Sequence, residues 1–151
     1  MSDPRATIKT LLSEEVINAN LTKDDDATEL AWHVLYEPNL ADLPALFHDK
    51  KIDLFFGIKD AGPCSTRYSC SHTGLYGVTP YAIDKFDSGG KRVITATVVL
   101  WKALKELRRV FKANPWGSLR NLVDDKIEVH DFGDTQVWSK PCQIEYKTYT
   151  S

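Results

Sequence analysis

The stretch from Arg92 to Ala113 constrains the fold more than any other part of the chain, because it contains neither glycine nor proline. Its apolar side chains recur at the i, i+3, i+4, i+7 spacing that places them on one helical face. Those residues are Ala96, Leu100, Ala103, Leu107 and Val110, with Leu104 and Phe111 beside them. Gly89 and Gly90 break the chain before the stretch, and Pro115 stops it. We therefore predict a helix from Arg92 to Ala113, about 30 Å long, against which the other elements pack.

The rest of the chain is predicted to form one more helix and a set of short strands. Asp3-Pro4 is a typical helix start, and an apolar stripe from Ile8 to Val16 follows it. Alternating patterns rich in β-branched and aromatic residues predict strands at 30–37, 52–59, 67–86, 126–132, 136–139 and 142–150. Segment 39–51 is predicted as a loop or short helical turn, and segment 116–125 as irregular chain.

The third strand region, 67–86, contains Pro80. Proline removes a donor from the hydrogen-bond ladder, so this part of the strand is predicted at a sheet edge or a bulge. The predicted element order is α-β-β-β-α-β-β, without the regular βαβ alternation of a doubly wound parallel sheet. We therefore predict the α+β class, with a mainly antiparallel or mixed sheet packed against the one long helix and an N-terminal helix.

Length and composition favour a single domain spanning residues 1–151. A hydrophobic fraction of 42% is enough for a core, and a net charge of −2 gives no global attraction to nucleic acid or to an anionic membrane. The chain has no run of about 18 apolar residues, and its start lacks the apolar region of a signal peptide. Three cysteines do not suggest a disulfide framework. We therefore expect synthesis in a reducing cytoplasm and no membrane partner.

Cys64, Cys70 and His72 come nearest to a metal-binding motif. Thiolates and imidazoles bind zinc, but the spacing here is C-x5-C-x-H rather than that of a zinc knuckle. A fourth ligand would come from far along the chain, and the candidates are His33, His48, His130 and Cys142. We therefore predict no metal and no cofactor. The alternative is a small metal- or ligand-binding domain or enzyme that uses the Cys64/Cys70/His72 region.

Other catalytic signatures are weaker still. The segment Ser88–Arg92 has the composition of an anion-binding loop before a helix, but Lys85 stands where a P-loop needs its first glycine. No G-x-S-x-G elbow occurs, and no pair of carboxylates stands out for acid–base work. A triad assembled in space is not excluded by sequence. We predict no catalytic residues.

The polar face of the predicted long helix is basic and carries Lys102, Lys105, Arg109 and Lys112. Such a face is able to contact nucleic-acid phosphates, to face a partner subunit or a pore, or simply to be solvated. Because the whole chain is slightly acidic, solvation is the favoured interpretation. No sequence-specific binding of nucleic acid is expected.

Three segments share a recognisable pattern: the opening DPRATIKTLLSE, the segment YAIDKFDSGGKRVITATVVLWKALKELRRVFKANP and the closing CQIEYKTYT, together more than a third of the chain. They resemble the tail-terminator, or tail-completion, proteins of tailed viruses and proviruses, including archaeal ones. The match lies in the order and polarity of these segments rather than in a catalytic signature. Pro80 and the segment CSTRYSCSH depart from the family pattern, which leaves the register of the third strand open.

The resemblance implies a small α+β subunit of the virion, located at the neck of the tail, with no catalytic residues. In that family the copies form a ring, commonly of six, that caps the tail tube and joins it to the head connector. The expected partners are other copies of the chain, a tail tube protein and a head-connector protein. Four tryptophans and six tyrosines supply side chains of the kind that anchor interfaces.

We predict that the loop of Ser88, Gly89, Gly90, Lys91 and Arg92 lies at a subunit or partner surface. Adjacent glycines lose much entropy when ordered, so the loop is expected to be mobile until a neighbour holds it. Lys91 and Arg92 would stand at the positive end of the helix dipole, where cations are disfavoured. A carboxylate of another subunit would relieve this, and the candidates are Asp24, Asp25 and Asp26. A solvated loop that tolerates the penalty is the alternative.

Overall fold

The computed structural model describes residues 4–12, 21–60, 65–68, 71–112 and 119–149, and within them it has the predicted α+β class. The helical elements are α1 (Pro4–Leu11), the 3-10 turn η1 (Leu40–Asp42), α3 (Leu43–Asp49) and α4 (Ala96–Lys112). The strands are β1 (Trp32–Tyr36), β2 (Leu54–Asp60), β3 (Ser65–Tyr68), β4 (Ser71–Ala82), β5 (Lys85–Phe86), β6 (Arg92–Ile94), β7 (Leu119–Asp124), β8 (Glu128–Asp131), β9 (Gln136–Ser139) and β10 (Cys142–Tyr149).

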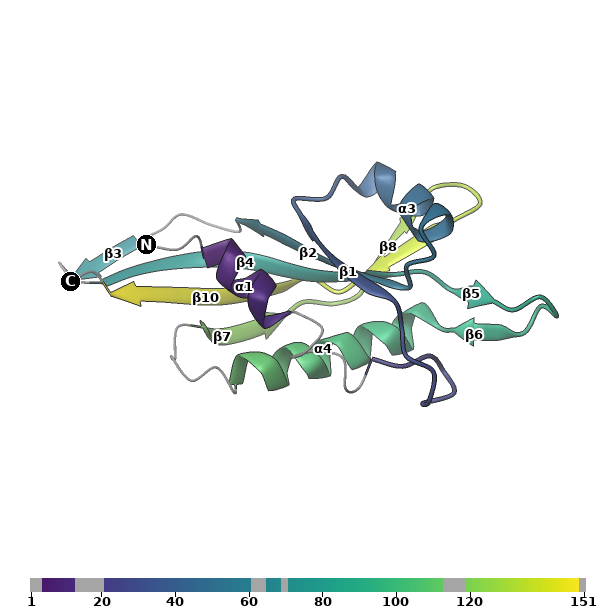
Figure 1. The fold of residues 1–151 in the computed structure, drawn as a ribbon. Coiled ribbons are helices and arrows are strands. Elements are labelled where there is room, and N and C mark those ends of the chain that lie inside the picture. The colour runs from purple at the N-terminus through teal and green to yellow at the C-terminus, as the bar shows by residue number, and fades with distance from the viewer. Residues whose placement is uncertain (1–3, 13–20, 61–64, 69–70, 113–118, 150–151) are drawn as a thin grey trace.

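The main sheet is mixed and mainly antiparallel, as predicted. Its strand order is β1-β2-β4-β10-β7, and β3 and β9 also pair with β4 while β8 pairs with β9. Strands β1 and β2 are parallel, and the other pairs described are antiparallel. Strands β5 and β6 form a separate two-stranded sheet. This hairpin, residues 85–94, extends away from the main sheet (Figure 1) and is called the hairpin arm below.

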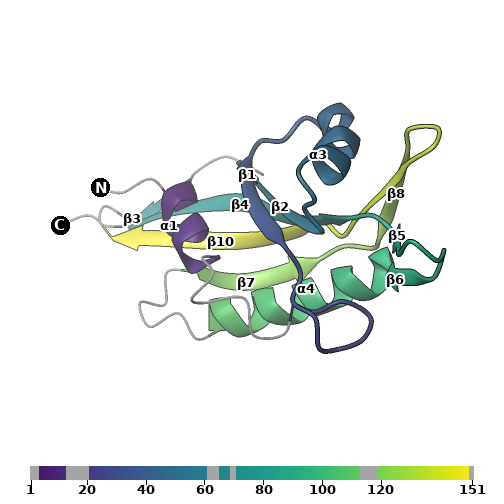
Figure 2. The ribbon, with the colours of Figure 1, turned by 45° about the vertical axis from the view of Figure 1, so that its right-hand side comes forward.

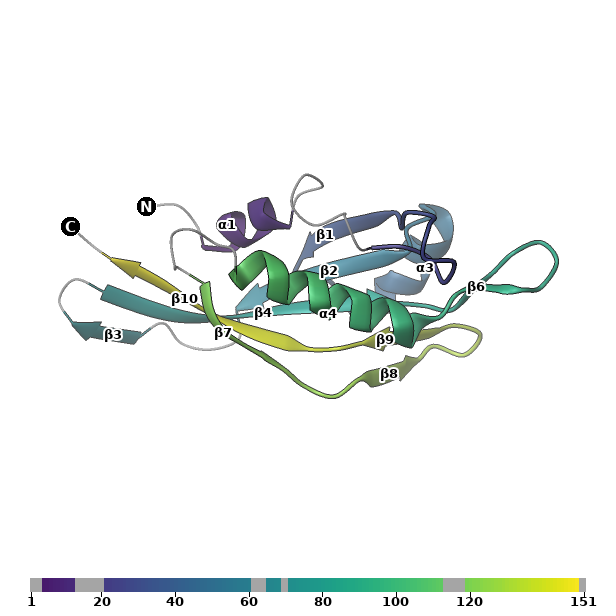
Figure 3. The ribbon, with the colours of Figure 1, turned by 90° about the horizontal axis from the view of Figure 1, so that it is seen from below.

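Helices cover both faces of the sheet, because β2 is apolar on both sides. Leu54, Phe56 and Ile58 contribute to a core shared with α1 and α4, whereas Phe55 contributes to a second core with α3. This alternation is the period of two that a strand imposes on its side chains. Figure 1 shows α3 and α4 on opposite sides of the sheet, and Figure 3 shows α4 running along it. The turned view in Figure 2 places the β8–β9 hairpin on the side of α3.

The apolar face predicted for the long helix is confirmed. All seven of its residues are buried, with at most 4% of each exposed: Ala96, Leu100, Ala103, Leu104, Leu107, Val110 and Phe111. The predicted start is wrong, because the helix begins at Ala96 and not at Arg92. Arg92–Ile94 forms β6 instead, paired across the arm with β5. The predicted last residue, Ala113, lies outside the described residues.

Other predicted elements also change. Residues 119–124, expected to be irregular, form β7 along β10. Segment 39–51, predicted as a loop or short helical turn, takes the helical alternative and forms η1 and α3. The predicted order α-β-β-β-α-β-β is therefore incomplete. Pro80 does not lie on an edge strand, because β4 pairs with β2 on one side and with β9 and β10 on the other. Pro80 falls at the point where β4 changes partner from β10 to β9, so its missing donor does not interrupt a continuous ladder.

The base of the hairpin arm is fixed by a largely buried ion pair. The Lys85 Nζ donates to Asp53 Oδ1 at 3.0 Å and to the carbonyl oxygens of Ile52 at 2.7 Å and Phe47 at 3.3 Å. The other oxygen of Asp53 accepts the Ala31 N–H at 2.9 Å. These bonds join the arm to α3 and to the segments that precede β1 and β2, so the arm leaves the sheet from a rigid base. None of the described helices is long and apolar enough to cross a membrane.

We predict that Leu107→Ala lowers the free energy of unfolding by about 2–5 kcal/mol, because it removes a buried side chain and leaves a cavity under the centre of α4. Chemical denaturation monitored by circular dichroism measures the change. Lys112→Ala, at an exposed position of the same helix, is the control and should change the free energy by less than about 0.5 kcal/mol. An equally small loss for Leu107→Ala would contradict the packing of α4 described above.

Candidate functional site

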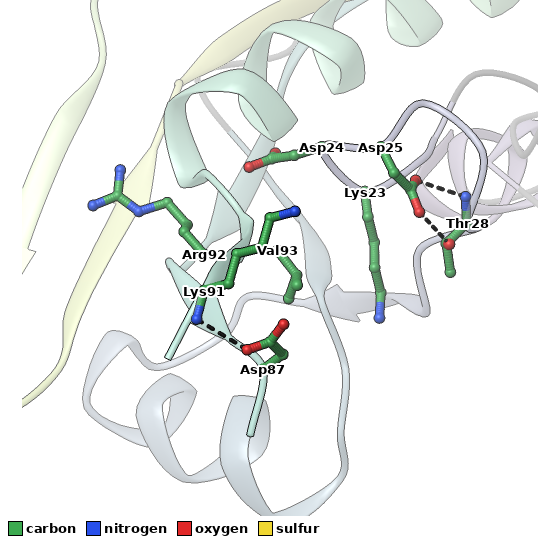
Figure 4. Close-up of a pocket in the computed structure, with 8 residues that line it drawn as sticks. All are labelled: Lys23, Asp24, Asp25, Thr28, Asp87, Lys91, Arg92 and Val93. Carbon is green, nitrogen blue, oxygen red and sulfur yellow. Dashed lines mark hydrogen bonds between the residues drawn. The ribbon is translucent and has the colours of Figure 1, made fainter. Parts of the chain in front are cut away.

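The structure brings the two halves of the predicted interface together within one chain. A cavity of about 360 Å³ lies between residues 22–28, called the acidic loop below, and the hairpin arm (Figure 4). It is lined by Lys23, Asp24, Asp25, Thr28, Asp87, Lys91, Arg92 and Val93. Ser88, Gly89 and Gly90 are exposed in the turn of the arm, and Asp26 is exposed in the acidic loop. The sequence had assigned these acidic and basic residues to different subunits.

The acidic loop is shaped by Asp25. Its carboxylate accepts the backbone N–H groups of Ala27 at 2.9 Å and Thr28 at 2.8 Å, and also the Thr28 hydroxyl. The hydroxyl bond of Thr28, with these two backbone bonds, lowers the pKa of Asp25 to about 2. Aspartate is favoured in turns because it forms such bonds to the residues that follow it. Asp25 is thus a structural residue of the loop.

Lys102 of α4 holds the acidic loop against the helix. Its Nζ donates to the carbonyl oxygens of Thr22 and Lys23, to the Thr22 hydroxyl and to Asp26, at 2.8–3.1 Å. Only 19% of the Lys102 side chain is exposed. The expectation of a solvated basic face is therefore wrong at Lys102. It failed because a long lysine side chain reaches acceptors in a segment far away in sequence.

Two carboxylates of the same chain meet the start of α4. Asp24 accepts the Thr95 N–H at 3.0 Å and the Thr95 hydroxyl at 2.6 Å, and Asp84 accepts the Ala96 N–H at 2.7 Å. Negative groups are stabilising at a helix N-terminus, where backbone N–H groups lack partners within the helix. Because α4 begins at Ala96, Lys91 and Arg92 do not stand at its dipole. The argument that they need a carboxylate from another subunit is therefore wrong.

The turn of the hairpin arm is held by Asp87. Its carboxylate accepts the N–H groups of Gly89 and Lys91, each at 2.9 Å. Its backbone N–H donates to the Lys91 carbonyl oxygen at 2.8 Å, and its carbonyl oxygen accepts the Gly90 N–H at 3.0 Å. Gly90 has a φ of 82°, a conformation that suits glycine. These bonds remove the physical reason for expecting the turn to be mobile in a free subunit. A preformed turn is an arrangement suited to contact with a partner.

The arm also exposes an aromatic side chain. Phe86 is 56% exposed, and the Arg92 guanidinium lies 5.6 Å from the centre of its ring. In the cavity, Asp24, Asp25 and Asp87 each bond to backbone N–H groups of the chain. By contrast, the amino groups of Lys23 and Lys91 form no ion pair among the described residues. An aromatic ring beside exposed cations is the chemistry of a polypeptide contact.

The metal hypothesis falls mostly on parts outside the described residues, namely Cys64, Cys70 and the His72 side chain. Among the side chains that are described, no group of three or more histidine, cysteine, aspartate or glutamate residues is placed to hold a metal ion. Cys142, one candidate fourth ligand, is buried, and its Sγ donates to the Lys140 carbonyl oxygen. Burial raises the pKa of the Cys142 thiol to about 12, so this thiol is a poor nucleophile and ligand.

One cluster that the sequence did not indicate contains a serine, a histidine and a carboxylate. The register of β8 and β9 places Glu128 opposite Ser139, on the face that also carries His130. The His130 Nε2 lies 3.1 Å from Ser139 Oγ and 3.8 Å from Glu128 Oε2. The serine hydroxyl and the glutamate carboxylate both approach the same ring nitrogen of His130. In a catalytic triad the nucleophile and the carboxylate bond to different nitrogens of the histidine. Ser139 is also only 1% exposed, so this arrangement does not present a nucleophile to a substrate.

The comparisons with known proteins give no assignment. No protein-family model matches the chain, and no curated protein matches its sequence. A functional inference therefore depends on the sequence pattern and the geometry described above.

We predict that Lys102→Met lowers the free energy of unfolding by about 2 kcal/mol, because it removes hydrogen bonds from a charged donor to the acidic loop. Thermal and urea denaturation measure the loss. Lys105→Met, one turn further along the exposed side of α4, should stay within about 0.5 kcal/mol of the wild type. Equal stability of the two variants would mean that Lys102 does not hold the loop.

We also predict that a metal chelator leaves the melting temperature unchanged. The spacing of Cys64, Cys70 and His72 is poor for zinc, and structural zinc contributes directly to folding free energy. Differential scanning calorimetry with and without excess EDTA, with metal analysis of the same sample, provides the measurement. A sharp fall in melting temperature, together with stoichiometric zinc, would favour the alternative of a metal-binding domain.

Proposed function

We propose that this protein is a structural subunit of a viral tail, a tail terminator that forms a ring at the end of the tail tube and joins it to the head connector. Its location would be the neck of the virion, and it would carry out no catalysis. The proposal rests on the resemblance of three segments to that family. It is supported by the preformed hairpin arm, which is the single observation that favours a contact role.

The arm has the properties expected of an element that binds another polypeptide. It forms a sheet of its own, and its base is fixed by the Lys85–Asp53 pair. Its turn is ordered by Asp87, so little conformational entropy is lost when it docks. It exposes Phe86 and Arg92, side chains of the classes that are enriched at interfaces, and the cation Lys91 beside them.

A ring of copies is the assembly that this proposal requires. Heterologous contacts, in which one surface of a subunit meets a different surface of the next, close into a ring when the rotation between neighbours permits. The chain would then contribute one surface to each neighbour and leave its remaining surfaces for the tail tube and the connector. Negative-stain images of the purified protein, with its native mass at micromolar concentration, test for rings directly.

We predict that Lys91→Glu/Arg92→Glu weakens assembly while the subunit stays folded, because both side chains are exposed on the arm and make no ion pair among the described residues. Native mass across a dilution series compares the variant with the wild type. Lys59→Glu/Lys126→Glu makes the same change of charge at exposed positions outside the arm and should assemble normally. Unchanged assembly of the arm variant would remove the arm from the interface.

A further inference from the structure

The outer side of α4 carries a continuous row of exposed residues. They are Val98, Trp101, Lys105, Arg108, Arg109 and Lys112, called the α4 stripe below. Their spacing of three or four residues places them along one side of the helix. The first two are apolar and the other four are basic, so the stripe offers an aromatic anchor next to a positively charged half.

The positive charge of the α4 stripe is only partly balanced within the chain. Arg108 pairs with Asp124 and Arg109 pairs with the buried Glu106, yet their side chains remain 56% and 46% exposed. Lys105 and Lys112 are exposed and form no ion pair among the described residues. An exposed, unpaired amino group attracts a carboxylate of a partner.

The side of the sheet that bears α3 has the opposite charge. Exposed carboxylates lie in η1, at the end of α3, on β8 and in the turn that follows β8: Asp42, Asp49, Glu128 and Asp134, called the acidic face below. The His48 Nε2 lies 3.2 Å from the Thr135 Oγ1. This contact holds α3 against that turn, so that the two form one surface. Lys50 and Lys51 are the exposed cations next to α3, and they offset only part of the negative charge.

These two surfaces lie on opposite sides of the subunit. Helix α4 packs on the core that contains Leu54 and Phe56, and α3 packs on the core that contains Phe55. Strand β9 contacts both helices, but Glu128 of β8 faces the α3 side, because its cross-strand partner Ser139 pairs in turn with Tyr81 of the second core. One copy therefore presents a basic, aromatic stripe on one side and a carboxylate-rich surface on the other.

The geometry points to a head-to-tail contact in which the α4 stripe of one copy docks on the acidic face of the next copy. This inference rests on the proposed ring and names its subunit contact. A two-fold contact through α4 would set two basic stripes against each other, which like-charge repulsion disfavours. The head-to-tail contact pairs opposite charges and has the heterologous form that a ring requires. Trp101 and Val98, 54% and 41% exposed, become the apolar end of the contact.

Reciprocal charge reversal tests the contact. The stripe variant is Lys105→Glu/Lys112→Glu, and the acidic-face variant is Asp49→Lys/Asp134→Lys. Each alone should raise the concentration for half-assembly by about a hundredfold, because each sets like charges opposite one another. An equimolar mixture should assemble again, since every contact in an alternating ring then joins complementary charges. Native mass spectrometry counts the two variants, which should alternate in assemblies with an even number of copies.

The outcomes separate this contact from the proposed function. A wild type that forms rings, while both variants form them equally well, overturns the contact and leaves the ring standing. Loss of assembly in both variants without recovery in the mixture also overturns it. A wild type that stays monomeric at every concentration overturns the ring itself. Circular dichroism confirms that each variant is folded, and Lys59→Glu/Lys126→Glu controls for the net charge of the stripe variant.

A nucleic acid on the stripe is the competing occupant. Fluorescence anisotropy with a duplex of random sequence, measured at several salt concentrations, tests for it. If the stripe variant assembles normally but loses duplex binding that the wild type shows, the subunit contact is overturned. If wild type and stripe variant bind the duplex equally or not at all, while assembly depends on the stripe, the contact is supported.

Discussion

The start of α4 depends on two carboxylates from other parts of the chain. Asp24 bonds to Thr95 and Asp84 bonds to Ala96, so both meet the N–H groups that a helix leaves without partners at its first turn. Asp84 lies just before the hairpin arm, and Asp24 lies in the acidic loop, 71 residues from Thr95. Charge-assisted bonds of this kind are stronger than those between neutral groups. They fix the point at which the chain leaves the arm and enters the helix, and so they orient the loop, the arm and α4 together.

The apolar pattern predicted the body of the fold better than its connections. The face of α4 through Leu100, Ala103 and Leu107 follows from helical spacing alone, and β9 has the predicted bounds. The first residues of the long apolar stretch did not reveal their structure, because Val93, Ile94 and Thr95 suit a strand as well as a helix. The carboxylates that decide between the two are distant in sequence. Strand β7 lacks clean alternation, and its pairing with β10 is irregular near Gln143, so periodicity did not indicate it.

The candidate site was predicted as a set of residues but not as an arrangement. The sequence singled out the glycine turn and the three consecutive aspartates, and both belong to the elements that border one cavity. It did not reveal that Asp24 meets α4 or that Asp26 meets Lys102, because these contacts span more than 70 residues. The role of Asp87 was readable in principle, since an aspartate two residues before a glycine pair commonly bonds to the turn that follows it. Long-range partners are decided by the packing of the whole chain.

The charged residues of α4 fall into two groups, which differ in whether their partners lie inside the subunit. Glu106 is fully buried and Lys102 is mostly buried, and each has its partner inside the subunit. A buried charge without a partner is strongly destabilising, so these residues are committed to folding. Lys105 and Lys112 are exposed, and no described carboxylate pairs with them. Solvated lysines cost the folded subunit little free energy. Because no described carboxylate of the chain pairs with them, they remain available to attract the carboxylates of an acidic partner.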